Sequence, residues 1–332
     1  MRLDNTRLSI STTNESSFNT QDTDETHYVD LPTTEAFFIL PKLEKVSNAG
    51  RVGRNAATHL CNTYWGHLEM TVKDDIETNV PGMLGRRGLG GTDTKTLVAT
   101  GVYDHEIPIL PPSVGDILPS FNMTGILGAS DFLLAGLMVD KMKWSQKGSE
   151  RAQYEAGILG SGKWQNPSDM EMPEQSDTDC MDGYKSVVQY TDVDGISIIN
   201  LSSLGTVLEW MIEQDNKIRR NKRRLGDPVQ SVGTGSGAYV RSMPRGKYET
   251  KASLTLDFND LTYWAKSVKN EKLTNFSVCV KGPKIATVAM VDYFHEYELI
   301  IPSFGFDSPD TGDDEGDAVT PINIVPFEDP IT

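Results

Sequence analysis

The feature that most constrains this chain is a strict alternation of polar and apolar residues in Lys247–Phe258, which reads KYETKASLTLDF. Side chains of a β-strand point alternately to opposite faces, so this pattern predicts a strand with one buried and one polar face. The predicted buried residues are Ala252, Leu254, Leu256 and Phe258, and the predicted polar residues are Lys251, Ser253, Thr255 and Asp257. A short amphipathic segment, Asn259–Lys269, and a second strand, Phe276–Lys281, follow. The strand Phe276–Lys281 is expected to end at Gly282-Pro283.

Composition sets the class of protein. The chain has 332 residues, 31 basic and 47 acidic side chains and a formal net charge of −16, which opposes non-specific binding to nucleic acid. Its three cysteines, Cys61, Cys180 and Cys279, lie far apart, so neither a structural zinc site nor a disulfide framework is expected. The N-terminal segment lacks an apolar signal core, and the longest apolar run, Phe132–Val139, is too short to span a membrane.

A second alternating stretch lies near the start of the chain, in Tyr64–Lys73. Leu68, Met70 and Val72 share its predicted buried face, and Glu69, Thr71 and Lys73 share the polar face. A short helix is expected at Val80–Gly85, with a proline near its start and a glycine at its end. Further strands are predicted at Val102–Leu110, at Leu137–Gln146 and at Val291–Pro302. The spacing of apolar residues in Leu201–Gly226 fits a helical face and a strand equally well, and a strand from Val207 onward is favoured.

These elements suggest two β-rich domains. The division is an N-terminal arm at 1–36, a first domain at 37–165, a linker or insertion at 166–200, a second domain at 201–305 and an acidic tail at 306–332. Residues 1–36 are expected to form an extended arm, although a disordered tail explains their polar composition equally well. The acidic segment Asp307–Asp317 is expected to be disordered, and a Pro-rich end with a short apolar patch, Ile322–Phe327, follows it. The halves share an order of strand, basic loop, alternating strand, short helix and strand, which indicates an internal repeat. In that alignment His105 and His295 occupy equivalent places.

The order of several motifs resembles the major tail tube proteins of long-tailed bacteriophages. Lys281-Gly282-Pro283 followed by Tyr297-Glu298-Leu299-Ile300-Ile301-Pro302 looks like the C-terminal signature of that family. The segment Glu15-Ser16-Ser17-Phe18-Asn19-Thr20 is similar to its Glu-Ser-x-aromatic-Gly-Thr opening, with Asn19 in place of the usual glycine. Val80–Gly90 and the stretch from Val102 to Ser120 also look familial, and the resemblance covers most of residues 14–305.

The resemblance implies a mostly β fold of two packed antiparallel sheets, a β-sandwich or half-barrel with short flanking helices, duplicated within the chain. It also implies stacked rings, trimeric with pseudo-six-fold symmetry or hexameric, that form a conduit for DNA ejection. The implied partners are further copies of the chain, a tape measure protein, a tail terminator and phage DNA that passes without specific binding. The implied location is the virion tail, after synthesis in the host cytoplasm, with no enzymatic activity, cofactor or membrane.

Two sets of residues are candidates for assembly. The first comprises the polar strand faces, expected to line a lumen or a subunit interface, although an outer solvent-exposed face explains them equally well: Glu69, Thr71, Lys73, Lys251, Ser253, Thr255 and Asp257. The second is the basic run, expected to contact acidic loops such as Asp307–Asp317 on the next ring: Lys217, Arg219, Arg220, Lys222, Arg223 and Arg224.

Other classes of function were weighed from the residues. Gly157–Trp164 has the glycine and lysine spacing of a phosphate-binding loop, but Trp164 stands where a magnesium-binding Ser or Thr is required. No catalytic or metal-binding constellation stands out, so no catalytic, cofactor or metal residue is assigned. The rival interpretations are another β-rich virion component, such as a tail terminator or capsid decoration protein, and a carbohydrate-binding adhesive β-sandwich.

Overall fold

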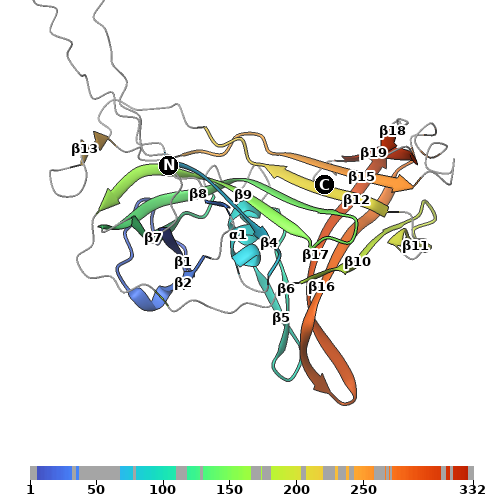
Figure 1. Ribbon diagram of the computed structural model, residues 1–332, viewed down its shortest axis with the longest axis horizontal. Helices are drawn as coiled ribbons and strands as arrows, with labels where there is room; N and C mark the ends of the chain where they lie inside the picture. The colour runs from blue at the N-terminus through green and yellow to red at the C-terminus, as the bar shows by residue number, and fades with distance from the viewer. Residues whose placement is uncertain are drawn as a thin grey trace, which may run out of the picture.

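The computed structural model describes residues 6–31, 35–36, 68–77, 80–109, 118–127, 130–165, 173, 181–202, 207–219, 229–230, 237–238, 243–257, 266, 269, 271–307, 312–314 and 317–327. The predicted fold class is confirmed, because the described chain is mostly β with one large antiparallel sheet (Figure 1).

The strands of the large sheet fall into two groups along the chain. The first group contains β1 (Thr6–Ser11), β2 (Tyr28–Asp30), β3 (Glu35–Ala36), β4 (Leu68–Asp75), β7 (Phe121–Leu127), β8 (Ser130–Lys147) and β9 (Gln153–Gln165). The second contains β10 (Asp182–Thr191), β11 (Ile198–Asn200), β12 (Val207–Asp215), β15 (Glu249–Asp257), β16 (Leu273–Val288), β17 (Val291–Phe306), β18 (Gly312–Asp314) and β19 (Asp317–Pro326).

The strand order runs β11-β10-β16-β17-β19-β15-β12-β8-β7-β1-β2, with β9, β4 and β3 continuing from the other edge of β8. Two small sheets stand apart, β5 (Thr94–Ala99) with β6 (Val102–Glu106) and β13 (Val229–Gln230) with β14 (Gly237–Ala238). The hairpins β5–β6 and β16–β17 both extend away from the body of the sheet in Figure 1. A 3-10 turn, Glu25–His27, precedes β2.

Both alternating stretches contain a strand in the part that the structure describes, β4 from Leu68 and β15 from Glu249. In β4, Met70 and Val72 are buried, and in β15, Ala252, Leu254 and Leu256 are buried. They belong to one apolar cluster that draws residues from both groups of strands, from Leu8 in β1 to Ile324 in β19. The strand predicted from Val207 is β12, and the predicted strand Leu137–Gln146 lies inside β8. Parts of four predicted segments lie outside the described residues. They are Tyr64–His67 and Phe258 of the two alternating stretches, Leu110 of the predicted strand Val102–Leu110, and most of Asn259–Lys269.

The predicted helix forms but is longer than expected. α1 runs from Val80 to Leu89, so Gly85 lies in its interior rather than at its end. The interior glycine has a packing reason: a β-carbon at Gly85 would lie 2.9 Å from the Tyr297 hydroxyl. The helix ends instead at Gly90, whose positive φ of 75° suits a left-handed C-terminal residue and whose N–H donates to the Arg86 carbonyl.

Several strands begin or end elsewhere than the sequence predicted; β6, for example, ends at Glu106 rather than at Leu110. β16 does not end at Gly282-Pro283 but continues to Val288, because a register shift between Lys281 and Lys284 accommodates the proline. The expected arm contains β1 and β2, and Leu8 and Ile10 of β1 are buried. The acidic segment Asp307–Asp317, expected to be disordered, contains β18. The Pro-rich end that follows it forms β19, whose Ile322 and Ile324 pack into the core. Short alternating segments are weak sequence signals, and here the sheet itself supplies their partners.

Candidate assembly surface

The polar residues predicted on β4 and β15 lie on the same face of one sheet. The pairing of neighbouring strands connects them. Lys73 on β4 lies opposite Glu155 on β9, which lies opposite Lys143 on β8. Lys143 in turn lies opposite Glu213 on β12, which lies opposite Lys251 on β15. Directly opposite residues on adjacent strands project from the same face. Two stretches about 180 residues apart in sequence therefore contribute to a single polar surface.

The five residues of this row alternate in charge across β4, β9, β8, β12 and β15, and we call the row the charge ladder. Its members are Lys73, Glu155, Lys143, Glu213 and Lys251. Each interior member has an opposite charge on both neighbouring strands, an arrangement worth roughly 0.2–1 kcal/mol per pair. The ladder thus favours this strand order and register over a slipped one.

All seven residues that the sequence predicted on polar strand faces lie on this face, and two of them, Lys73 and Lys251, belong to the ladder. Glu69, Lys251 and Asp257 are exposed, and Thr71, Lys73, Ser253 and Thr255 are half-buried. Over the five strands the face carries five lysines and eight carboxylates, so its formal charge is negative. They are Lys73, Lys141, Lys143, Lys147 and Lys251, with Glu69, Asp75, Glu155, Glu209, Glu213, Asp215, Glu249 and Asp257.

The three central strands were not assigned to the surface from sequence. Lys141, Lys143 and Lys147 on β8 and Glu209 and Glu213 on β12 lie between the two predicted strands. Alternation in both segments was a usable signal for a strand with one polar face. It could not indicate that β8 and β12 pair with each other, which is what joins the two predicted faces.

An ion-pair cluster fixes the start of the basic run to the edge of this surface. The Lys217 ammonium lies 3.0 Å from an Asp215 carboxylate oxygen and 3.1 Å from one of Glu249, and Lys141 approaches the same Asp215 carboxylate to 3.5 Å. Burial alone would raise the pKa of Asp215, but hydrogen bonds from the Lys217 amide and side chain, with the charge of Lys141, outweigh burial and hold that pKa below its ordinary value. The hydrogen bond to Asp215, followed by that to Glu249, raises the pKa of Lys217.

Of the other candidates in the basic run, the structure describes Arg219. Arg219 is exposed, and its backbone N–H donates to the Pro244 carbonyl. Arg220, Lys222, Arg223 and Arg224 lie outside the described residues. Their expected contact with Asp307–Asp317 of a neighbouring ring stays a prediction, whereas Lys217 has carboxylate partners within its own chain.

The opening motif around Glu15 is held by a set of directional hydrogen bonds. The Glu15 carboxylate accepts from the backbone N–H of Asn19 at 2.8 Å, the N–H of Gly136 at 2.7 Å and the hydroxyl of Ser120 at 2.6 Å. Burial raises the pKa of Glu15, and these three donors oppose that rise. Asn19 has a φ of 68°, a left-handed conformation that glycine adopts most easily and asparagine tolerates better than most residues.

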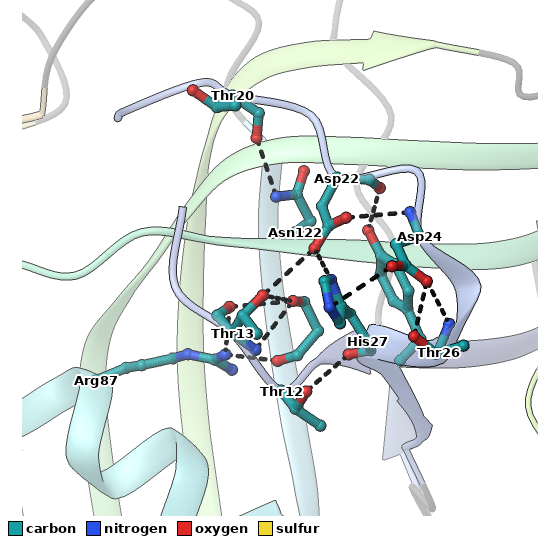
Figure 2. A network of polar contacts seen from close by, with 11 residues as sticks. Thr12, Thr13, Thr20, Asp22, Asp24, Thr26, His27, Arg87 and Asn122 are labelled. Carbon is teal, nitrogen blue, oxygen red and sulfur yellow. Dashed lines mark hydrogen bonds and ion pairs between the residues drawn. The ribbon is translucent and has the colours of Figure 1, made fainter. Parts of the chain in front are cut away.

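Arg87 ties the helix α1 to the segment that precedes this motif (Figure 2). Its guanidinium donates to the carbonyls of Ser11 and Thr13 and to the Asn14 side chain, and it stacks 4.4 Å above the ring of Phe121. Arg87 is 2% exposed, and burial lowers its pKa to about 9. All three acceptors are neutral, so these contacts are hydrogen bonds rather than ion pairs. They hold α1 against the N-terminal segment, and we call Arg87 a clamp between the two.

Next to this clamp, Figure 2 shows a second polar cluster around Asp22 and His27. The His27 ring nitrogen lies 2.8 Å from an Asp22 carboxylate oxygen, and the hydrogen bond to Asp22 raises the pKa of the imidazole. The Tyr28 hydroxyl donates to the Asp22 carbonyl, and Asp24 caps the short 3-10 turn through Thr26. Together these contacts order the connection between β1 and β2.

Exposed apolar side chains mark a second candidate surface on the projecting hairpins. On β5–β6 the exposed residues are Leu97, Val98 and Tyr103, and at the end of β16–β17 they are Ile285, Met290, Val291 and Phe294. Met290, in the turn between β16 and β17, is 99% exposed. A two-stranded hairpin with apolar side chains in water has little to stabilise it alone, so these ends are suited to contact another surface.

Comparison with known proteins adds no identification. No family model matches the chain, and no curated protein matches it in sequence. Within the described part of the chain, no helix has the length and apolar character needed to cross a membrane. The segment that resembled a phosphate-binding loop, Gly157–Trp164, lies within the antiparallel strand β9 rather than in a strand-to-helix turn.

Proposed function

We propose that this protein is a structural subunit of a bacteriophage tail tube, which polymerises into stacked rings around a channel for DNA. The observation that carries the proposal is the continuous polar face from β4 to β15. A ring of subunits can place such faces next to one another around a wet lumen, while the opposite face packs on the apolar core. Closing the sheet between subunits also removes edges that would otherwise aggregate.

The charge of this face is compatible with a passage for DNA. Five lysines are outnumbered by eight carboxylates over the five strands, and the whole chain has a formal charge of −16. Phosphate binding draws on lysine and arginine that displace counterions, and a net negative wall offers no such gain. DNA would therefore slide along this face without being retained.

The opening motif supports the family resemblance behind the proposal. The one departure from that motif, Asn19 in place of glycine, occurs where the backbone is left-handed at φ 68°. Both residue types are suited to that conformation, so the substitution preserves the backbone geometry of the motif. Glu15, the first residue of the motif, holds the loop through Asn19, Ser120 and Gly136.

The proposal includes the assembly and partners expected from the resemblance. Rings would contain three duplicated chains, or six chains if each contributes one unit, and would stack into a tube bounded by a tail terminator. A tape measure protein and then DNA would occupy the lumen, and the tube would be part of the virion.

Electron microscopy of the purified full-length protein tests this function directly. We expect rings or hollow tubes with a central channel, and ring averages would distinguish three-fold from six-fold symmetry. A stable monomer at all concentrations, or a monomer that binds glycans, would overturn the proposal in favour of the adhesive alternative. A single terminal ring or a capsid-bound decoration would favour the other virion components.

A further inference from the structure

The large sheet contains the same strand order twice. The first group of strands runs β2-β1-β7-β8-β9-β4-β3, and the second runs β11-β10-β16-β17-β19-β15-β12. Taken in chain order, each strand of the first series has its counterpart at the same place in the second: β1 with β10, β2 with β11, β3 with β12, β4 with β15, β7 with β16, β8 with β17 and β9 with β19. All of these pairings are antiparallel.

Local details agree with this correspondence. The residue after β2, Leu31, donates its N–H to the Leu8 carbonyl on β1, and the residue after β11, Leu201, donates to the Val188 carbonyl on β10. The helix α1 follows β4, and Lys266, which is helical, follows β15. The correspondence corrects the sequence alignment in one place: β17 matches β8 rather than β6, so His295 and His105 are not equivalent.

Among the described strands, one pair, β8 with β12, joins the two groups of strands in the sheet, and we call these groups the first and the second unit. Residues Glu209–Asp215 of β12 pair in unbroken register with Lys147–Lys141 of β8, beyond the end of the β7–β8 pairing. The counterpart of β8 in the second unit is β17, continued along β19 by β18. In the first unit, β12 lies beside the end of β8. At the corresponding place in the second unit, which is the outer edge of β18, the described residues show no strand.

The counterpart of β12 in the first unit is β3, and its only described partner is β4. The described part of the sheet therefore has two complementary edges. The outer edge of β18 corresponds to the edge of β8 that binds β12, and β3 corresponds to β12 itself. These two edges are complementary by the geometry of the internal β8–β12 contact. Unpaired edges of this sort readily take up another strand.

We propose that β3 of one chain pairs with the end of β17 and with β18 of the next chain, and so repeats between chains the contact that β8 and β12 make within each chain. This inference rests on the proposed function, and it deepens that function by naming the edges that join one subunit to its neighbour. The contact is head-to-tail, so each chain uses one edge to bind forward and the other to bind backward. Repetition of one rotation closes such a contact into a ring.

Proline substitutions test the two edges separately. Successive N–H groups of a strand point to opposite edges, so of two neighbouring positions only one directs its N–H outward. Proline is therefore introduced singly at Glu35 and Ala36 in β3, and singly at Asp313 and Asp314 in β18. In each pair, proline at the position whose N–H points outward leaves the hydrogen bonds within the chain intact, so this variant is recognised by an unchanged unfolding temperature. We expect this variant to lose assembly. The matched control is Ile198→Pro, on the edge strand β11, which the proposed contact does not use.

The decisive measurement is the sedimentation of a β3 variant, of a β18 variant and of their mixture. A folded β3 variant keeps a competent β17–β18 edge, and a folded β18 variant keeps a competent β3. Each alone should sediment as a monomer at concentrations where the wild-type chain forms rings, and an equimolar mixture should sediment as a dimer that grows no further. The proposed contact would be overturned if the folded edge variants still formed rings, or if their mixture stayed monomeric. In either case, rings formed by the wild-type chain would leave the proposed function intact. A wild-type chain that never assembles would overturn both.

Discussion

The indole Nε1 of Trp144 on β8 donates a hydrogen bond of 3.1 Å to the hydroxyl of Tyr297 on β17, 153 residues later in the chain. The same hydroxyl lies 3.5 Å from the Pro81 carbonyl, at the start of α1. Burial raises the pKa of Tyr297, so the hydroxyl stays protonated. One side chain of the second group of strands thus links a strand and the helix of the first.

This relationship predicts a non-additive pair of substitutions. Gly85→Ala would place its β-carbon 2.9 Å from the Tyr297 hydroxyl and should destabilise the protein by about 1–3 kcal/mol. Tyr297→Phe removes the hydrogen-bond acceptor of Trp144 and should cost about 1 kcal/mol. Because Phe also removes the clashing oxygen, the double variant should lose less than the sum of the two. Urea unfolding of the four proteins measures this coupling, and strict additivity would contradict it.

The charge ladder predicts a salt-sensitive loss of stability on charge reversal. Lys143→Glu would place like charges opposite both Glu155 and Glu213 and should lower the free energy of unfolding by about 1–2 kcal/mol at low ionic strength. The loss should shrink in about 0.5 M salt because screening is then nearly complete at these distances. The matched control is Lys143→Gln, which removes attraction without adding repulsion. A loss that is equal for both variants and independent of salt would show that the ladder is not electrostatic.

Asp74 predicts the response of stability to mildly acidic pH. Burial raises its pKa to about 6, assisted by the nearby carboxylates of Asp75 and Glu77. The folded-state pKa lies above the unfolded value, so between about pH 4 and 6 the folded protein binds more protons, and this contribution to stability falls as pH rises through 6. Asp74→Asn should therefore stabilise the protein at pH 7 by about 1 kcal/mol, after allowance for partial solvent screening.

The measurement for Asp74 is the free energy of unfolding at several pH values from 4 to 8. The difference between Asp74→Asn and the wild type should grow across pH 4–6 and then level off. Glu69→Gln is the matched control on the same strand, because Glu69 is exposed on the polar face of β4 and is not among the groups that shift the pKa of Asp74. A constant difference over the whole range would contradict the assignment to Asp74.

The left-handed residue of the opening motif predicts opposite effects of two substitutions. Asn19→Gly should leave stability unchanged or raise it by a few tenths of a kcal/mol, because glycine adopts a φ of 68° without steric cost. Asn19→Val should lower it by more than about 1 kcal/mol, because a β-branched residue is strained in this region. Thermal unfolding distinguishes them, and equal melting temperatures would mean that the loop adapts.

Arg87 predicts a large effect from a single buried side chain. Arg87→Met keeps much of the aliphatic volume but removes the guanidinium donor to the Ser11 carbonyl and to the Asn14 side chain, and should cost about 2–4 kcal/mol. The Thr13 carbonyl loses one donor and keeps the Ser11 hydroxyl. Arg86→Met is the matched control, because Arg86 lies one residue earlier in α1 and makes an exposed ion pair with Asp93. Hydrogen exchange should show the loss concentrated in the β1–β2 segment, and a loss spread evenly over the sheet would contradict the clamp.

The sequence by itself determined the class of fold and the faces of its strands. A period of two in β4 and β15 is a local property of the chain, and so is the break in periodicity at α1, which explains why those elements could be predicted. It did not determine the ends of elements that depend on partners. β1 has six residues and β18 three, β19 contains two prolines, and β16 passes through a Gly-Pro pair at a register shift.

Only the tertiary structure decided which strands lie side by side. The pairing of β8 with β12 brings Lys143 opposite Glu213, and it merges two predicted polar faces into one surface. Local pattern cannot specify that pairing, because any strand with one apolar face can bury it against several partners, and register is chosen by the whole sheet. The same limit applies to the proposed internal repeat: sequence suggested two similar halves, and the correspondence that we propose between their elements rests on the order of strands in space.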